Sequence, residues 1–211
     1  ARQCQAARDD MLRLAPWASR PGTPTARATG LPSLRELAAR TADKTRRDTP
    51  DRKLMLMKTL VSAAELMVLL KSAHPPVLLD CSFDLADTAA GHRTWQASHL
   101  PGAHYLHLDN DLSGPKHDSN GVFHGRHPLP DRAAFAATLG RCGIGPATPV
   151  VTYDAQGGPY AARAWWLLCW LGHEDVAVLD GGTAAWCAAG GTLETQAPAL
   201  PGDAPYPLHA P

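Results

Sequence analysis

The sequence lacks the features of a membrane, secreted or metal-binding protein. No apolar run reaches the roughly 18–20 residues that a membrane-spanning helix needs, and the first ten residues, ARQCQAARDD, lack the apolar core of a secretory signal. The five cysteines are odd in number, and no two stand in C-x-x-C spacing. We therefore expect free thiols in a cytoplasmic protein, without a disulfide framework, a zinc site, a cofactor or a membrane partner.

The chain also has no net charge, but its charge is divided unequally. The 20 Lys and Arg residues balance 20 Asp and Glu residues. Residues 1–53 hold 12 basic and 6 acidic residues, a net of +6, which leaves 8 and 14, a net of −6, for residues 54–211. The second part therefore has no large basic field for nucleic acid.

Residues 1–54 differ in composition from the remainder, with much Arg, Ala, Thr and Pro and few large apolar side chains. This composition predicts a mostly disordered extension, with one short helix where Ser33 and Glu36 have capping-box spacing. Alternatively, the natural start is Met55 or Met57, and the upstream residues lie outside the evolved domain. The acidic residues argue against an organelle transit peptide.

From residue 58 onward, short apolar strands alternate with helical patterns. The predicted strands are 76–82, 103–109, 149–153 and 176–179. Helices are expected from Ser62 to about Lys71, from Asp131 to Gly140 or Gly143, after residue 159 and from residue 183 to 190. The alternation predicts one α/β domain over residues 58–195, with a parallel sheet covered by helices on both faces. The Pro-rich tail, residues 196–211, predicts an extended linker toward a second domain.

One segment, VVTYDAQGGPYAARAWWLL at residues 150–168, predicts a strand, a glycine-containing loop and a helix. Such a loop directs backbone N–H groups toward whatever lies inside it, which favours an anion. The loop residues are Asp154, Ala155, Gln156, Gly157, Gly158, Pro159 and Tyr160. Asp154 is interpreted first as a cap of the following helix, because Asp is a preferred capping residue; a direct chemical role is the alternative.

Several segments resemble a known family. The HLPGA sequence at 99–103, with Trp95 where the family has Phe or Tyr, resembles the first motif of rhodanese-like domains. The segments LVSAAEL, VLLDCSFDL, HPLPDRAAFAATLGRCGI, VVTYDAQGG, RAWWLL and VLDGGTAAW add to the resemblance in their order. Together they resemble the N-terminal half of tandem-domain thiosulfate and 3-mercaptopyruvate sulfurtransferases, which implies a three-layer rhodanese-like fold.

The resemblance implies how the loop is used in the family. A family cysteine at the first loop position takes a sulfane sulfur, becomes a persulfide and passes the sulfur to a thiophilic acceptor. Asp154 stands at that position here and cannot carry sulfur, so the resemblance implies a non-catalytic half. The implied partners are a C-terminal rhodanese-like domain with the cysteine and a small sulfur-containing substrate.

Other residues have two interpretations each. His99 either assists proton movement at the seam between the halves, as the resemblance implies, or orders the turn before its strand. Arg163 either directs its charge at the seam or at Asp154, or forms an ion pair or is solvated. We expect Cys81, Cys169 and Cys187 to be buried. We expect at least one of three tryptophans to be solvent-accessible beside the Asp154 loop and His99: Trp165, Trp166 and Trp170.

Competing functions rest on weaker signals. A stand-alone binding or regulatory module would use the vacant loop or the tryptophan face. A loop phosphatase would need a Cys-x5-Arg sequence, and the loop has no cysteine. His104 and His107 are not expected to share a metal, because strand residues three apart point to opposite faces.

Overall fold

The computed structural model describes residues 59–200, 204 and 206–208. The predicted extension at 1–54 and the possible starts at Met55 and Met57 lie outside these residues. Within the part that is described, no helix is both long and apolar enough to cross a membrane.

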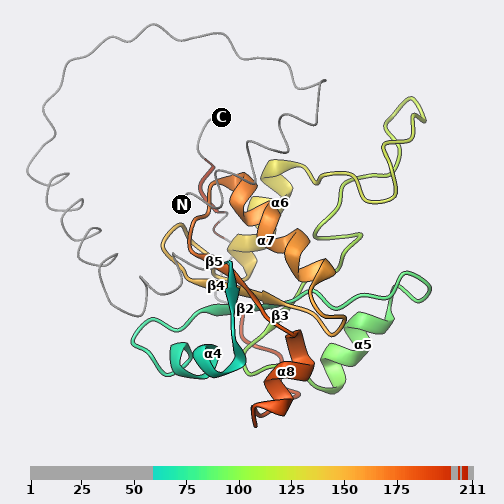
Figure 1. Cartoon of the computed structure of the whole chain (residues 1–211). Coiled ribbons are helices and arrows are strands. Elements are labelled where there is room, and N and C mark those ends of the chain that lie inside the picture. The colour runs from blue at the N-terminus through green and yellow to red at the C-terminus, as the bar shows by residue number, and fades with distance from the viewer. Residues whose placement is uncertain (1–58, 201–203, 205, 209–211) are drawn as a thin grey trace, which may run out of the picture.

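Five parallel strands form one sheet (Figure 1). They lie in the order β1-β5-β4-β2-β3. Their bounds are β1 Leu60–Val61, β2 Val77–Asp80, β3 His104–Tyr105, β4 Val150–Tyr153 and β5 Val176–Leu179. The predicted parallel sheet is therefore confirmed, although β3 is much shorter than expected.

In the part of the chain that the structure describes, five helices cover both faces of the sheet. They are α4 Ala63–Leu69, α5 Ala90–Ala97, α6 Arg132–Arg141, α7 Pro159–Leu171 and α8 Gly182–Ala188. Figure 1 shows α6 and α7 on one side of the sheet and α4, α5 and α8 on the other. The predicted α/β three-layer domain is confirmed by this arrangement.

Alternation along the buried strands divides the apolar side chains into two cores. In β4, Val150 joins the core under α6 and α7, whereas Val151 and Tyr153 join the core under α4 and α8. This alternation follows from the period of two in a strand. The strands are apolar on both faces because both faces are covered.

The predicted helix caps are present. Ser62 Oγ accepts a hydrogen bond from the Glu65 N–H at 3.3 Å, and Glu65 Oε2 accepts one from the Ser62 N–H at 3.0 Å. Asp131 Oδ1 accepts a hydrogen bond from the Ala134 N–H at 2.9 Å. Both helices therefore begin where their capping residues predict, while α4 ends at Leu69, before the expected Lys71.

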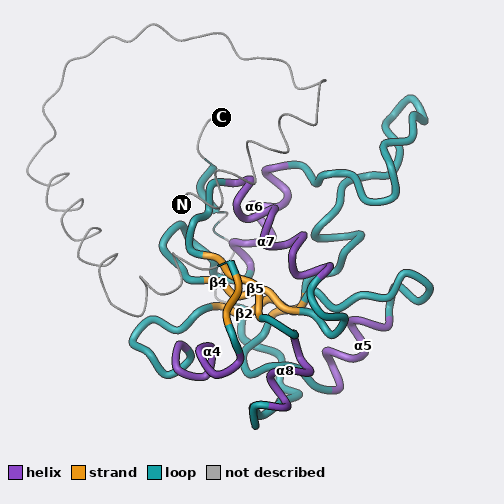
Figure 2. Tube along the Cα trace, in the orientation of Figure 1, coloured by secondary structure: helices purple, strands orange, loops and turns teal. Residues whose placement is uncertain are grey.

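The tail beyond α8 lies against the domain at two points. Glu194 forms an isolated antiparallel bridge with His99. Tyr206 is 4% exposed, and its N–H donates to the Ala136 carbonyl of α6 at 3.0 Å. The described residues of the tail form no helix or strand, and the role of the tail as a linker stays a prediction. The long loop between β3 and α6 extends away from the sheet (Figure 2).

Candidate functional site

The loop between β4 and α7 is closed around the side chain of Asp154, which has no exposed surface. Oδ1 accepts hydrogen bonds from the N–H groups of Gln156 at 2.9 Å and Gly158 at 2.7 Å. Oδ2 accepts hydrogen bonds from Tyr160 at 2.9 Å and Ala161 at 2.9 Å. The carboxylate therefore occupies the position that a bound anion would take in this loop.

The backbone around Asp154 explains how four N–H groups reach one carboxylate. Gly157 and Gly158 have φ values of 87° and 121°, which favour glycine. Pro159 is the first residue of α7 and has no N–H, so the donors in the helix are the next two residues. Both of these donors lie in the first turn of α7, so Asp154 caps the helix with its side chain, although the N-cap residue itself is Gly158.

Neighbouring segments hold the loop in place from both sides. The Ala155 N–H donates to Ser82 Oγ, beyond β2, at 3.0 Å. The Thr183 N–H of α8 donates to the Asp154 carbonyl at 3.2 Å. A Cβ atom on Gly182 would lie 2.0 Å from the same carbonyl oxygen, so α8 approaches the loop closely only because it begins with glycine. The loop is therefore packed closely around the Asp154 carboxylate.

His99 is buried under the chain that follows α8. Its Nδ1 lies 2.7 Å from the Trp95 carbonyl, and its Nε2 lies 3.3 Å from the Gln196 carbonyl. The ring stacks on the Trp95 indole with centroids 4.7 Å apart. These contacts support the interpretation that His99 orders the turn before β3, and its role at a seam stays a prediction.

Arg163 bonds to backbone carbonyls and not to Asp154, while its expected role at a seam stays a prediction. Its Nε donates to the Leu112 carbonyl at 2.9 Å, and its Nη2 donates to the carbonyls of His127 and Pro128, each at 3.0 Å. Burial lowers the pKa of its guanidinium from the usual value. Arg163 therefore fastens the long loop between β3 and α6 to α7, a contact that local sequence spacing cannot predict.

The described cysteines are all free thiols, and three of them are buried. Burial, then the charge of Asp80, raises the pKa of the Cys81 thiol well above its usual value. Burial also raises the pKa of Cys142 to about 12. Cys169 is buried, as predicted, whereas Cys187 is exposed in the last turn of α8, so the prediction for Cys187 is wrong.

A buried polar pair that was not expected from the sequence, Asp80 and Tyr153, lies at the carboxyl ends of β2 and β4. Asp80 is 4% exposed, and burial raises the pKa of its carboxyl despite opposing hydrogen bonds from Ser82 and Tyr153. The Tyr153 hydroxyl accepts a hydrogen bond from the Leu100 N–H at 3.2 Å. A carboxylate at the carboxyl end of an apolar strand, as Asp80 is in β2, is the signal that could have identified this pair.

The tryptophans of α7 and the turn of His99 do not form one surface. Trp165, Trp166 and Trp170 are half-buried against the core under α6 and α7. Leu100, which follows His99, belongs to the core on the opposite face of the sheet. None of the three is fully buried, so the expected accessibility is confirmed, whereas the expected place beside His99 is wrong, because the sheet separates the two.

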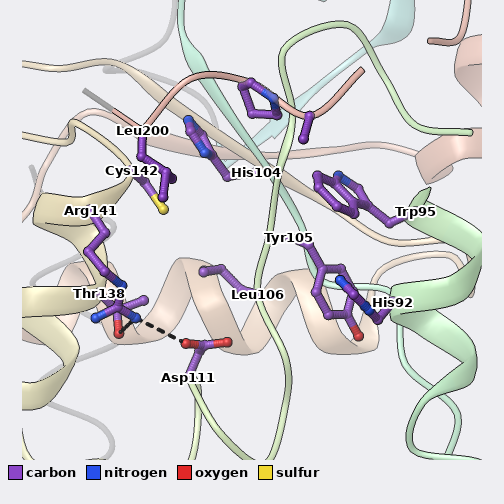
Figure 3. A pocket seen from close by; sticks show the side chains of 12 residues that line it. His92, Trp95, His104, Tyr105, Leu106, Asp111, Thr138, Arg141, Cys142 and Leu200 are labelled. Atoms are coloured by element: carbon purple, nitrogen blue, oxygen red, sulfur yellow. Dashed lines mark hydrogen bonds and ion pairs between the residues drawn. The ribbon is translucent and has the colours of Figure 1, made fainter. Parts of the chain in front are cut away.

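A cavity of about 320 Å³ lies at the edge strand β3, between α5 and α6. Figure 3 shows the side chains of His104, Cys142, Arg141 and Asp111 around it. Arg141 Nη2 lies 3.4 Å from Asp111 Oδ1, so this guanidinium is already paired with a carboxylate. Among the described residues, no three His, Cys, Asp or Glu side chains are arranged to hold a metal ion.

Comparison with known proteins identifies the relatives of this chain. The rhodanese-like domain family model matches residues 62–189. A probable 3-mercaptopyruvate sulfurtransferase of Pseudomonas aeruginosa is 50% identical over 129 residues, 60% of this chain and 44% of that protein. A putative thiosulfate sulfurtransferase of Mycobacterium tuberculosis is 42% identical over 138 residues, 65% of this chain and 47% of that protein.

A solved structure agrees with these sequence relatives. The 3-mercaptopyruvate sulfurtransferase from Leishmania major superimposes with a TM-score of 0.59 and 27% identity, covering 77% of this chain and 41% of that chain. The chain is therefore homologous to 3-mercaptopyruvate and thiosulfate sulfurtransferases. It spans less than half the length of the relatives named here.

Proposed function

Because the chain belongs to the rhodanese-like domain family, we propose that it is the N-terminal, non-catalytic half of a two-domain sulfurtransferase. The intact enzyme would move a sulfane sulfur from thiosulfate or 3-mercaptopyruvate to a thiophilic acceptor. The reactive cysteine would come from a C-terminal rhodanese-like domain.

The filled loop at Asp154 is the observation that carries this proposal. With thiosulfate, sulfur transfer needs a thiolate that attacks the sulfane sulfur, breaks its bond to the second sulfur and releases sulfite with the electron pair. The resulting persulfide then gives its outer sulfur to an acceptor such as cyanide, forming thiocyanate and restoring the thiolate. A carboxylate cannot accept sulfur in this way, and Asp154 already uses four N–H groups that would stabilise a thiolate.

The described cysteines do not replace the missing thiolate. Cys81 and Cys142 are buried, and burial raises the pKa of each thiol, which disfavours the reactive form. Cys187 is exposed but lies in the last turn of α8, away from any helix N-terminus. Free thiols also support the proposed cytoplasmic location, where disulfides are rare.

An activity assay on the whole chain tests the proposal. We expect no thiocyanate from thiosulfate and cyanide, and no sulfur transfer from 3-mercaptopyruvate to a thiol. Turnover that one Cys→Ser substitution abolishes would overturn the non-catalytic assignment and identify the true nucleophile. Turnover that survives substitution of every cysteine would overturn the thiolate mechanism.

A second experiment separates the proposed half from a stand-alone binding module. In this experiment, the chain is fused to a C-terminal rhodanese-like half that has a cysteine in its loop. The fusion is expected to transfer sulfur only if this domain is the natural neighbour of such a half. A matched fusion in which that loop cysteine is Ser controls for this chain's own contribution. An active cysteine fusion with an inactive serine fusion supports the proposal, whereas a folded but inactive cysteine fusion favours the module.

A further inference from the structure

A cavity of about 330 Å³ lies at the first turn of α7, next to the loop that Asp154 fills. Its lining combines apolar and basic side chains: Leu85, Leu108, Arg126, His127, Pro159, Tyr160 and Arg163. The Asp154 carboxylate uses the loop N–H groups. A ligand of this cavity would therefore be recognised by side chains and not by the loop backbone.

The two arginines at this cavity can use their positive charge to bind a ligand. Neither Arg126 nor Arg163 forms an ion pair with a carboxylate among residues 59–200, 204 and 206–208. The cavity at β3 differs, because its Arg141 is paired with Asp111. Two guanidinium groups without a carboxylate partner favour an anionic ligand.

Arg163 is held in one orientation by the bonds already described. Its Nε and Nη2 donate to three backbone carbonyls and, at 3.3 Å, to Ser113 Oγ. Its Nη1 makes no hydrogen bond to a described residue. A guanidinium that is fixed on one side and unbonded on the other is already positioned for a ligand, which reduces the entropic cost of binding.

His127 adds a polar atom without a partner. Its Nδ1 lies 3.2 Å from Asp109 Oδ1, and Lys116 Nζ lies 3.5 Å from the same oxygen. Both ring nitrogens are buried, and neither has a hydrogen-bond partner in the described part of the chain. Buried polar atoms are rarely left unsatisfied, so such an atom at a cavity indicates a missing hydrogen-bond partner.

We propose that this cavity binds a small carboxylic acid with a short apolar tail. Arg126 and the free side of Arg163 would hold the carboxylate, while Leu85, Leu108 and Pro159 would contact the tail. The volume leaves room for such a molecule. The proposal depends on the side chains of this cavity alone and does not require that the chain take part in sulfur transfer.

Titration of the whole chain with butyrate, followed by NMR, tests the proposal. The backbone amide signals of Tyr160 and Arg163 should shift and saturate, with a dissociation constant of roughly 1 mM, as expected for a ligand of few atoms. Butyramide, which has a similar shape but no charge, should cause no saturable shift. Inorganic phosphate at equal ionic strength should bind more weakly, because it has no apolar tail.

Matched arginine variants give the second part of the test. Arg126 is exposed, so Arg126→Gln should leave the fold intact and weaken butyrate binding by about threefold to fivefold. Arg141→Gln, which removes the same charge at the other cavity, should leave binding within about 1.5-fold. Any of four results would overturn the proposal. Arg126→Gln and Arg141→Gln could weaken butyrate binding equally, or butyrate could cause no saturable shift. Butyramide could bind saturably, or phosphate could bind as tightly as butyrate.

Discussion

The carboxylate of Asp154 supplies, from within the chain, the negative charge that the loop before α7 is arranged to bind. Its four N–H partners come from the loop and from the first turn of the helix. One side chain therefore closes the loop, caps α7 and satisfies buried donors that would otherwise lack partners. This single residue links the fold to the proposed loss of catalysis.

Removing this carboxylate should destabilise the domain. Asp154→Ala should lower the free energy of unfolding by about 3 kcal/mol or more, because four N–H groups lose a charged acceptor. Asp154→Asn should cost about 2 kcal/mol, because the amide keeps one acceptor oxygen but places an NH₂ group against two donors. Urea unfolding followed by circular dichroism measures both changes.

The exposed Asp180 provides a matched control for that measurement. Asp180→Asn should change the free energy of unfolding by less than about 0.5 kcal/mol. Equal effects at positions 154 and 180 would show that the buried hydrogen bonds of Asp154 contribute little to stability.

A cysteine at position 154 should have a lowered thiol pKa. Burial alone would raise this pKa, but N–H groups at a helix N-terminus lower thiol pKa values from about 8.5 into the range of roughly 3.5–7.5. We expect the hydrogen bonds to prevail in Asp154→Cys, because the loop already holds a buried carboxylate. The ultraviolet absorbance of the thiolate, followed against pH in a Cys187→Ser background, reports the pKa.

Asp180→Cys in the same background is the control, because it introduces an exposed thiol just beyond β5. The thiol at position 154 should titrate at least about one pH unit below the thiol at position 180. A higher pKa at position 154 would mean that desolvation outweighs the N–H groups, and that the loop does not stabilise a thiolate.

The sequence predicted the contacts of a site residue only where its partners lie close to it in the chain. The capping role of Asp154 follows from its position before a helix, so the sequence was sufficient. Arg163 bonds to carbonyls at 112, 127 and 128, which lie 35 or more residues away in the chain. Nothing in the sequence near Arg163 distinguishes such a contact from an ion pair.

Among the helices and strands, those that are long enough or clearly capped could be predicted from the sequence. β4, β5 and α7 follow from apolar runs, α7 also from the glycines at both of its ends, and all three were expected. β1 contains two residues, too few to show a period. α5 begins at Ala89 without a side-chain cap and buries only Gly91, so neither a start signal nor an apolar stripe indicates it.

Tyr206 should attach the tail to α6 and α7. Its hydroxyl lies 3.2 Å from His173 Nδ1, and its ring lies at the edge of the His173 ring with centroids 5.7 Å apart. Tyr206→Ala should lower the free energy of unfolding by about 3 kcal/mol, and Tyr206→Phe by about 1 kcal/mol. Urea unfolding of each variant measures the change.

Leu208→Ala is the control in the same segment, because Leu208 is 41% exposed. Its effect should stay below about 0.5 kcal/mol. If Tyr206→Ala lowers the free energy of unfolding no more than Leu208→Ala does, Tyr206 does not anchor the tail. The position at which the chain leaves this domain is then not fixed by Tyr206.

For the whole molecule, attachment of the tail affects where a following domain would lie. Glu194 pairs with His99, and Tyr206 contacts α6, so the chain crosses from one face of the sheet toward the other. A domain that follows residue 211 would therefore start close to this half, whereas one placed before residue 1 would be separated by the 54 residues of the predicted extension. Effective concentration falls as a linker lengthens beyond the distance it spans.

Two fusions of the same pair of halves test this consequence. A C-terminal rhodanese-like half with a loop cysteine is joined either after Pro211 or before Ala1, and thiocyanate formation is measured at low enzyme concentration. We expect clearly faster turnover when the half follows Pro211, because the short tail keeps the two domains in contact. When the C-terminal half is also added as a separate protein, the difference in turnover between the two fusions should shrink as its concentration rises. Contact between the halves then no longer depends on the linker. Equal turnover of both fusions at every concentration would show that the tail does not position the second domain, and the proposed order of the two halves would lose its physical basis.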